Sequence, residues 1–132
     1  MSTLSIGTIK SLTGSGPPVV QNSAGTEVGT FCRAWVNFNV TTGVPTISGS
    51  FNVSGIVDNG VGNFTVNFAS AFQDTNYAVA AFARKNSIDD ANPLIVSANH
   101  TYVYTTSAFQ LKTVVGSWAF QDGTNVSVAF FR

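Results

Sequence analysis

The chain has 132 residues, enough for one domain with a core of its own, and only 9% of them are charged. Six basic and six acidic side chains cancel, and the basic ones are scattered, which argues against nucleic acid or an anionic membrane surface as partner. Neutral polarity comes instead from 14 Ser, 15 Thr and 12 Asn. Copies with such a surface repel one another weakly, so the composition favours a protein that assembles.

The first 30 residues differ from the rest of the chain. They are rich in Gly, Ser and Thr, contain Pro17-Pro18, and hold only isolated apolar residues such as Ile6 and Ile9. We therefore predict an extended N-terminal arm over residues 1–30, either disordered alone or ordered against a neighbouring subunit. Its start lacks a charged stretch followed by an apolar block, so we expect no secretory signal. No apolar run approaches the ~18–20 residues of a membrane-spanning helix, which argues against membrane insertion.

The stretch FCRAWVNFN (31–39) marks the expected start of the folded domain, residues 31–132. Alternate side chains of a strand point to opposite faces. One phase is small or apolar and is expected to face inward: Cys32, Ala34, Val36 and Phe38. The other phase carries Arg33 and Trp35. A guanidinium stacked on an indole, or paired with a carboxylate of a second chain, is a common interface arrangement, so we predict inter-subunit contacts at Arg33 and Trp35.

Period-two alternation recurs along the domain, and no stretch shows convincing helical periodicity. Two segments place apolar side chains on one face: 64–68 and 125–131. Residues 50–56 are expected to form one strand with Phe51 and Val53 on a shared face. Residues 77–84 are apolar on both faces, which is typical of an interior strand. Further short strands are predicted at 94–98, 101–105 and 108–113.

Turn residues separate these segments. Asp58-Asn59-Gly60 precedes the strand at 64–68, and Asp122-Gly123 precedes the strand at 125–131. Both supply residues that tolerate positive φ, as tight hairpins require. The pattern predicts an all-β chain: a single jelly-roll-like β-sandwich of seven to eight short antiparallel strands, with the N-terminal arm outside it.

Residues with chemical potential are few. His100 is the only histidine and Cys32 the only cysteine, so an internal disulfide is excluded. Nothing around His100 resembles a nucleophile site, and Cys32 is expected to be a buried small hydrophobe. Asp89 and Asp90 are adjacent, which is poor geometry for an acid–base pair; Ca²⁺ binding is an alternative, but a solvated loop before Pro93 explains them better. We expect no catalytic residue, no cofactor and no metal.

Tyr102 and Tyr104 share one face of the segment 101–105. They are candidates for an outer binding surface, where their rings would stack on a sugar or contact a partner. The alternative is that they cover a sheet face inside a subunit interface. Five N-glycosylation motifs reflect the composition of the chain, at Asn39, Asn52, Asn63, Asn99 and Asn125.

Several segments resemble a group of small bacteriophage tail-fibre-like proteins and fibre C-terminal modules, including those of cyanobacterial phages. The resemblance lies in five segments: MSTLSIGTIK (1–10), 22–39, 50–72, 74–79 and VSVAFFR (126–132). The series CRAWVNFN, SFNVS, DNG and FTVNF is its most specific part, residues 40–49 depart from the group's Gly-rich pattern, and residues 84–124 match least. The resemblance implies a surface-exposed virion structural protein, a homotrimer without catalytic residues.

Three functions remain open at this point. A tail-fibre or receptor-binding component would contact other virion proteins and present loops to a host-surface glycan. A capsid decoration (cement) protein would place the same trimer on the head, and the lack of repeated shaft sequence favours it. A glycan-degrading enzyme would need two carboxylates at a suitable separation. Of six acidic residues, Glu27 lies in the N-terminal arm and Asp58 and Asp122 are expected in turns, which leaves Asp74, Asp89 and Asp90. We therefore predict a protein that is not an enzyme.

Overall fold

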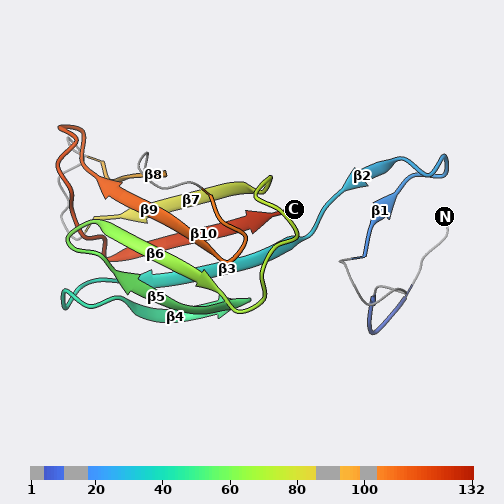
Figure 1. Ribbon diagram of the computed structural model, residues 1–132, viewed down its shortest axis with the longest axis horizontal. Helices are drawn as coiled ribbons and strands as arrows, with labels where there is room; N and C mark the ends of the chain where they lie inside the picture. Colours follow the sequence, from blue (N-terminus) through green and yellow to red (C-terminus); the bar gives the residue numbers. More distant parts are fainter. Residues whose placement is uncertain (1–4, 11–17, 86–92, 99–103) are drawn as a thin grey trace. The chain divides into compact units, whose positions relative to one another are not determined.

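The computed structural model describes residues 5–10, 18–85, 93–98 and 104–132. The chain divides into two compact units, Met1–Phe31 and Cys32–Arg132. Within the described ranges all regular secondary structure is β-strand, in ten strands (Figure 1). A helix long and apolar enough to cross a membrane is not found among these residues.

The N-terminal unit contains one small hairpin. Strand β1 (Val20–Gln21) pairs antiparallel with β2 (Glu27–Gly29). Asn22 stabilises the turn, because its Oδ1 accepts hydrogen bonds from the backbone N–H groups of Ala24 and Thr26, both at 3.0 Å. None of the described residues of this unit is buried. The hairpin is therefore held by its backbone and turn rather than by a core.

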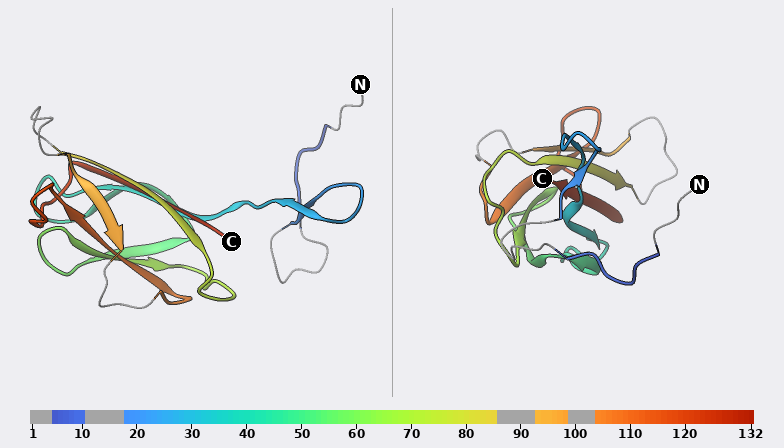
Figure 2. Two further views of the ribbon diagram at one scale, coloured as in Figure 1. Left: turned by 90° about the horizontal axis from the view of Figure 1, so that it is seen from above. Right: turned by 90° about the vertical axis from the view of Figure 1, so that its right-hand side faces the viewer.

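The second unit is a β-sandwich of two four-stranded antiparallel sheets, visible as two layers in Figures 1 and 2. The first sheet has the order β4 (Thr46–Phe51), β3 (Cys32–Asn39), β10 (Asn125–Phe131) and β7 (Ala78–Arg84). The second has the order β5 (Val53–Asp58), β6 (Asn63–Phe68), β9 (Ala108–Val114) and β8 (Ile95–Ala98). The predicted all-β sandwich of short antiparallel strands is confirmed.

The core lies between the sheets and is rich in phenylalanine. The central strands alternate, with every second side chain buried in β6, in β10 and, from Ala34 onward, in β3. Phe130 of β10 lies at the centre of an aromatic cluster, with ring centroids 4.9 Å from Phe68, 5.4 Å from Phe109 and 5.9 Å from Tyr77. These pairs are edge-to-face, the arrangement that aromatic quadrupoles favour.

The segment 50–56, predicted as one strand, is two strands in different sheets. Asn52 separates them with φ 53°, in the left-handed region. Its side chain holds the corner: Oδ1 accepts a hydrogen bond from the Ser70 N–H at 2.7 Å, and Nδ2 donates to the Arg33 and Ser70 carbonyls, each at 3.1 Å. Because the chain crosses between sheets here, Phe51 is exposed while Val53 packs against the core, and the predicted shared face was wrong.

We expect Asn52→Val to lower the free energy of unfolding by about 2–4 kcal/mol, because a β-branched residue is strained at positive φ and cannot make these hydrogen bonds. Asn52→Gly keeps the backbone geometry and loses only the side chain, so its cost should be about 1–2 kcal/mol. Urea unfolding of both variants measures the difference. If both variants lose the same free energy of unfolding, the positive φ of residue 52 does not affect stability.

The two predicted turns have different outcomes. Asp58-Asn59-Gly60 does connect β5 to β6; the Gly60 N–H donates to Asp58 Oδ1 at 2.8 Å, and Gly60 has φ 114°. Asp122-Gly123 is no hairpin, because the chain reverses earlier, at Trp118, whose φ is 63°. Residues 117–121 contribute only one bridge, Val114 with Phe120.

Asp122 and Gly123 have other roles. Asp122 Oδ1 accepts a hydrogen bond from the Gly62 N–H at 2.7 Å and so links two loops that are 60 positions apart. A Cβ on Gly123 would lie 2.9 Å from Val126 Cγ2, so close packing rather than positive φ requires glycine there. The turn prediction failed because the same residue types also serve tertiary contacts.

The placement of three further segments also differs from expectation. Residues 77–84 were predicted as an interior strand, but among the described strands β7 pairs only with β10 and so lies at the edge of its sheet, and Phe82 on it is 77% exposed. The predicted strand 94–98 is the short edge strand β8. In the predicted strand 101–105, residues 101–103 lie outside the described residues, and Tyr104 and Thr105 are not in a strand. Strands β9 and β10 agree with prediction.

Candidate interaction surface

The outer face of the β4-β3-β10-β7 sheet carries exposed aromatic side chains. Strand register places Trp35 of β3 between Phe51 of β4 and Ala129 of β10, and Ala129 next to Ala80 of β7. Trp35 is 41% exposed and Phe51 55% exposed. A row of two large aromatic and two small side chains therefore crosses the sheet on the side away from the core.

The neighbouring row has the opposite arrangement of sizes. Asn37 of β3 lies between Gly49 and Ser127, and Ser127 lies next to Phe82 of β7. The missing side chain of Gly49 makes room for the Trp35 indole, since a Cβ there would lie 3.3 Å from Trp35 Cη2. Small residues in one row thus accommodate large residues of the other.

Together the two rows enclose a shallow hollow of about 270 Å³. Trp35 and Phe82 form its rims and small side chains its floor: Ala80, Ala129 and Ser127. Asn37 also lines it, and its Oδ1 atom is buried without a hydrogen-bond partner among the described residues. The hollow is therefore largely apolar, with Asn37 and Ser127 as its polar residues.

The two predicted contact residues, Arg33 and Trp35, lie on one strand phase, but they are not stacked on each other. The Arg33 guanidinium lies over the Phe72 ring instead, 5.9 Å from its centroid. On the inward phase, Cys32 is only half-buried, and its Sγ lies 3.2 Å from the Ala34 carbonyl oxygen. Contact of Arg33 and Trp35 with a second chain stays a prediction.

Tyr104, predicted for an outer binding surface, lies against the aromatic core. Its ring centroid is 5.3 Å from Tyr77 and 5.1 Å from Phe109, and the side chain is 38% exposed. Burial, followed by the neighbouring Tyr104, raises the pKa of Tyr77 to about 12, so the Tyr77 hydroxyl stays protonated and donates to the Thr105 carbonyl at 3.1 Å. Tyr104 packs against Tyr77 and Phe109 at the edge of the core. Tyr102 and His100 lie outside the described residues.

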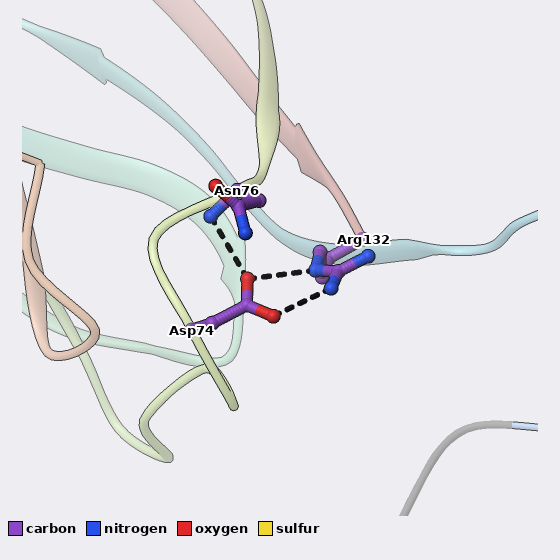
Figure 3. Close-up of polar contacts among 3 residues, drawn as sticks. All are labelled: Asp74, Asn76 and Arg132. Atoms are coloured by element: carbon purple, nitrogen blue, oxygen red, sulfur yellow. Dashed lines mark hydrogen bonds and ion pairs between the residues drawn. The ribbon is translucent and has the colours of Figure 1, made fainter.

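The three aspartates with described structure, Asp58, Asp74 and Asp122, each accept hydrogen bonds from nearby backbone or side-chain groups. Asp74 forms a two-point ion pair with the C-terminal residue Arg132, and its Oδ1 accepts a hydrogen bond from the Asn76 N–H at 2.8 Å (Figure 3). The Arg132 hydrogen bond, followed by that from Asn76, lowers the pKa of Asp74. A carboxyl held ionised in this way is poorly suited to act as a general acid. Asp58 and Asp122 accept the loop hydrogen bonds described above, and Asp89 and Asp90 lie outside the described residues.

Sequence reasoning identified Trp35 but missed Phe51 and Phe82. Both are strand phenylalanines, and a pattern of alternating apolar residues assigns such side chains to a core. Both are exposed because they point to the outer face of their sheet: Phe51 is the strand partner of Trp35, and Phe82 lies on the outward phase of β7. In the described part of the chain, no group of three or more His, Cys, Asp or Glu side chains could hold a metal ion.

Comparisons with protein-family models, with curated proteins and with solved structures gave no match.

Proposed function

We propose that this protein is a non-enzymatic structural component of a bacteriophage particle, and that it acts by binding copies of itself and other virion proteins. The observation that supports an assembly role is the aromatic outer face of the β4-β3-β10-β7 sheet. Phe51, Trp35 and Phe82 are 55%, 41% and 77% exposed on that face. Fully burying one large apolar side chain contributes about 1.5–3 kcal/mol, so the face offers a substantial driving force for association.

The assignment to a phage particle rests on the sequence resemblance described above. The near absence of charge agrees with it, because 9% charged residues and a net charge of zero give little repulsion between neighbouring copies. The N-terminal unit would serve for attachment, since it has exposed apolar residues such as Val19 and Val28 and no buried described residue. In the form that the resemblance implies, the protein is a homotrimeric tail-fibre or receptor-binding component, and its loops contact a host-surface glycan.

A capsid decoration protein is the second candidate. The observation that favours it is the absence of repeated shaft sequence between the N-terminal unit and the sandwich. In this role the sandwich would sit on the head and the N-terminal unit would bind adjacent capsid subunits. The two roles use the same self-association and differ in the virion protein that is bound.

Antibody labelling of purified particles tests the proposal. Labelling at the tail supports the tail-fibre role, and dense labelling of the head supports the decoration role. Particles that carry none of this chain would contradict both roles.

The assembly role has its own test in the mass of the isolated protein. We expect the isolated protein to form an oligomer at micromolar concentration. We expect Trp35→Ser to shift the equilibrium toward the monomer, because it removes a central aromatic contact. Light scattering coupled to size-exclusion chromatography measures both. A parent protein that is monomeric at this concentration would contradict self-association.

A further inference from the structure

Strand β7 is an edge strand that lacks the usual protection against pairing. Natural sheets protect their edges with bulges, charged residues, proline or very short strands. The other three edges have such features: register irregularities where β4 meets β3 and where β5 meets β6, and a length of only four residues in β8. Strand β7 has seven residues, AVAAFAR, without proline and with its one charge at the last position.

The geometry of β7 is regular over its whole length. All seven residues pair with β10 without a register shift. Its outward residues are exposed, and its inward residues Val79, Ala81 and Ala83 are only half-buried although they pack against the core. The neighbouring edge strand β8 belongs to the other sheet and pairs with β9. In the described ranges, the side of β7 away from β10 therefore has no strand bonded to it.

We propose that β7 pairs antiparallel with β7 of a second copy, centred on Ala81, so that two four-stranded sheets join across a two-fold axis. This inference deepens the proposed assembly role and rests on it, because it names the surface through which copies associate. An edge-to-edge contact satisfies the free backbone N–H and C=O groups of both strands. The same surface patch is used on both copies, as a two-fold interface requires.

The sequence of β7 is complementary to itself in this register. Residues facing one another have numbers that sum to 162, so Ala80 lies opposite the partner's Phe82, and Val79 opposite the partner's Ala83. Each large side chain thus meets a small one. Arg84 lies opposite the partner's Ala78, which puts the two arginines at opposite ends of the joined strands, roughly 20 Å apart at about 3.4 Å per residue. No like charges face each other, and this register pairs all seven residues.

The hollow on the outer face accommodates the same contact. The partner's Phe82 emerges beside Ala80, and a phenylalanine ring reaches over a strand spacing of about 4.8 Å. It would cover the small side chain of Ala80 at the near side of the hollow, whose far side is bounded by Trp35. By symmetry, Phe82 of the first copy enters the hollow of the partner. The protruding Phe82 ring and the hollow lie next to each other on one surface. This arrangement suits a second copy of this chain better than an unrelated partner.

A two-fold contact does not close a trimer. If the chain forms the trimer that the sequence resemblance implies, trimer contacts use another surface, and β7 joins trimers in pairs. The assembly would then contain an even number of copies.

Disulfide trapping tests the register directly. In a Cys32→Ala background, Ala81→Cys puts two thiols opposite each other at the two-fold axis, within disulfide range. Ala83→Cys is the matched control: it is also a half-buried alanine on the inward side of β7, but its two copies would lie four residues apart, beyond disulfide range. Under mild oxidation we expect Ala81→Cys to give at least about tenfold more cross-linked dimer than Ala83→Cys.

A second pair of variants tests the contribution of the Phe82 side chain without introducing cysteines. Phe82→Ser and Phe51→Ser both remove an exposed phenylalanine from the outer face, and only Phe82 lies on β7. We expect Phe82→Ser to raise the dissociation constant of the two-fold contact by about tenfold or more, and Phe51→Ser by less than about twofold. Sedimentation at a series of concentrations measures both, and circular dichroism checks that both variants keep the β-sheet spectrum.

The outcomes separate this inference from the proposed function. An assembled parent protein with equal cross-linking of the two cysteine variants overturns the β7 contact and leaves the assembly role intact. A three-copy assembly whose dissociation constant is unchanged by Phe82→Ser also overturns the β7 contact and leaves the assembly role intact. A monomeric parent protein without cross-links overturns both. Preferential cross-linking of Ala81→Cys, with loss of association in Phe82→Ser, supports the two-fold contact.

Discussion

Replacing Gly62 with alanine is expected to lower the free energy of unfolding by about 3–5 kcal/mol, the largest effect we expect outside the aromatic core. Gly62 has φ 63°, and a Cβ there would lie 2.5 Å from the Thr113 carbonyl oxygen and 2.7 Å from the Gln121 backbone nitrogen. Both are backbone atoms, so neither moves away by a change of rotamer. The loop after Gly60 would have to separate from β9.

The same position carries hydrogen bonds that a shift would break. The Gly62 carbonyl accepts from the Thr113 N–H at 2.8 Å, and the Gly62 N–H donates to Asp122 Oδ1. Thr113, which is fully buried, in turn donates its hydroxyl to the Gln121 carbonyl. Displacing Gly62 would leave buried polar groups of this network unsatisfied, which adds to the cost.

Gly43→Ala is the matched control. Gly43 has a similar φ of 75°, but nothing lies within 4 Å of its Cβ position. It should cost only the strain of a left-handed alanine, about 1–2 kcal/mol. Urea unfolding followed by tryptophan fluorescence compares the two variants. If both lose the same stability, the close backbone contact at Gly62 does not constrain the fold.

Phe130→Ala is expected to cost about 3–5 kcal/mol, which is a large fraction of the 5–15 kcal/mol that stabilises a typical domain. Phe130 is fully buried and contacts the rings of Phe68, Phe72, Tyr77 and Phe109. Its removal leaves a cavity between the two sheets, because two of the surrounding rings, Phe68 and Phe109, come from strands fixed by their hydrogen bonds. The variant should unfold at a much lower denaturant concentration.

Phe51→Ala provides the comparison for the core substitution. It removes the same side chain from a strand of the same sheet, but one that is 55% exposed. We expect a loss of about 1 kcal/mol or less, since most of the ring already contacts water. Comparable losses for Phe51→Ala and Phe130→Ala in chemical denaturation would contradict the placement of the aromatic core.

Local sequence determined much of this protein. The alternation in β3, β6 and β10 correctly placed Ala34, Val36 and Phe38 inside, because side-chain direction in a strand follows directly from residue number. The turn at Asp58-Asn59-Gly60 was also predictable, because residues that tolerate positive φ produce that geometry within a few positions. The all-β class followed from the pattern of alternation in the same way.

Only the tertiary structure decided which strands lie at the centre of a sheet and which at an edge. The apolar sequence of β7 fits an interior strand equally well, and nothing within residues 77–84 shows that one neighbour is missing. The sheet change at Asn52 is equally hidden, because its hydrogen-bond partners Arg33 and Ser70 are 18 or 19 residues away in the chain. Strand order and sheet crossing depend on such distant pairings. For that reason the exposed aromatic face, formed by residues from β3, β4 and β7, became visible only in the folded chain.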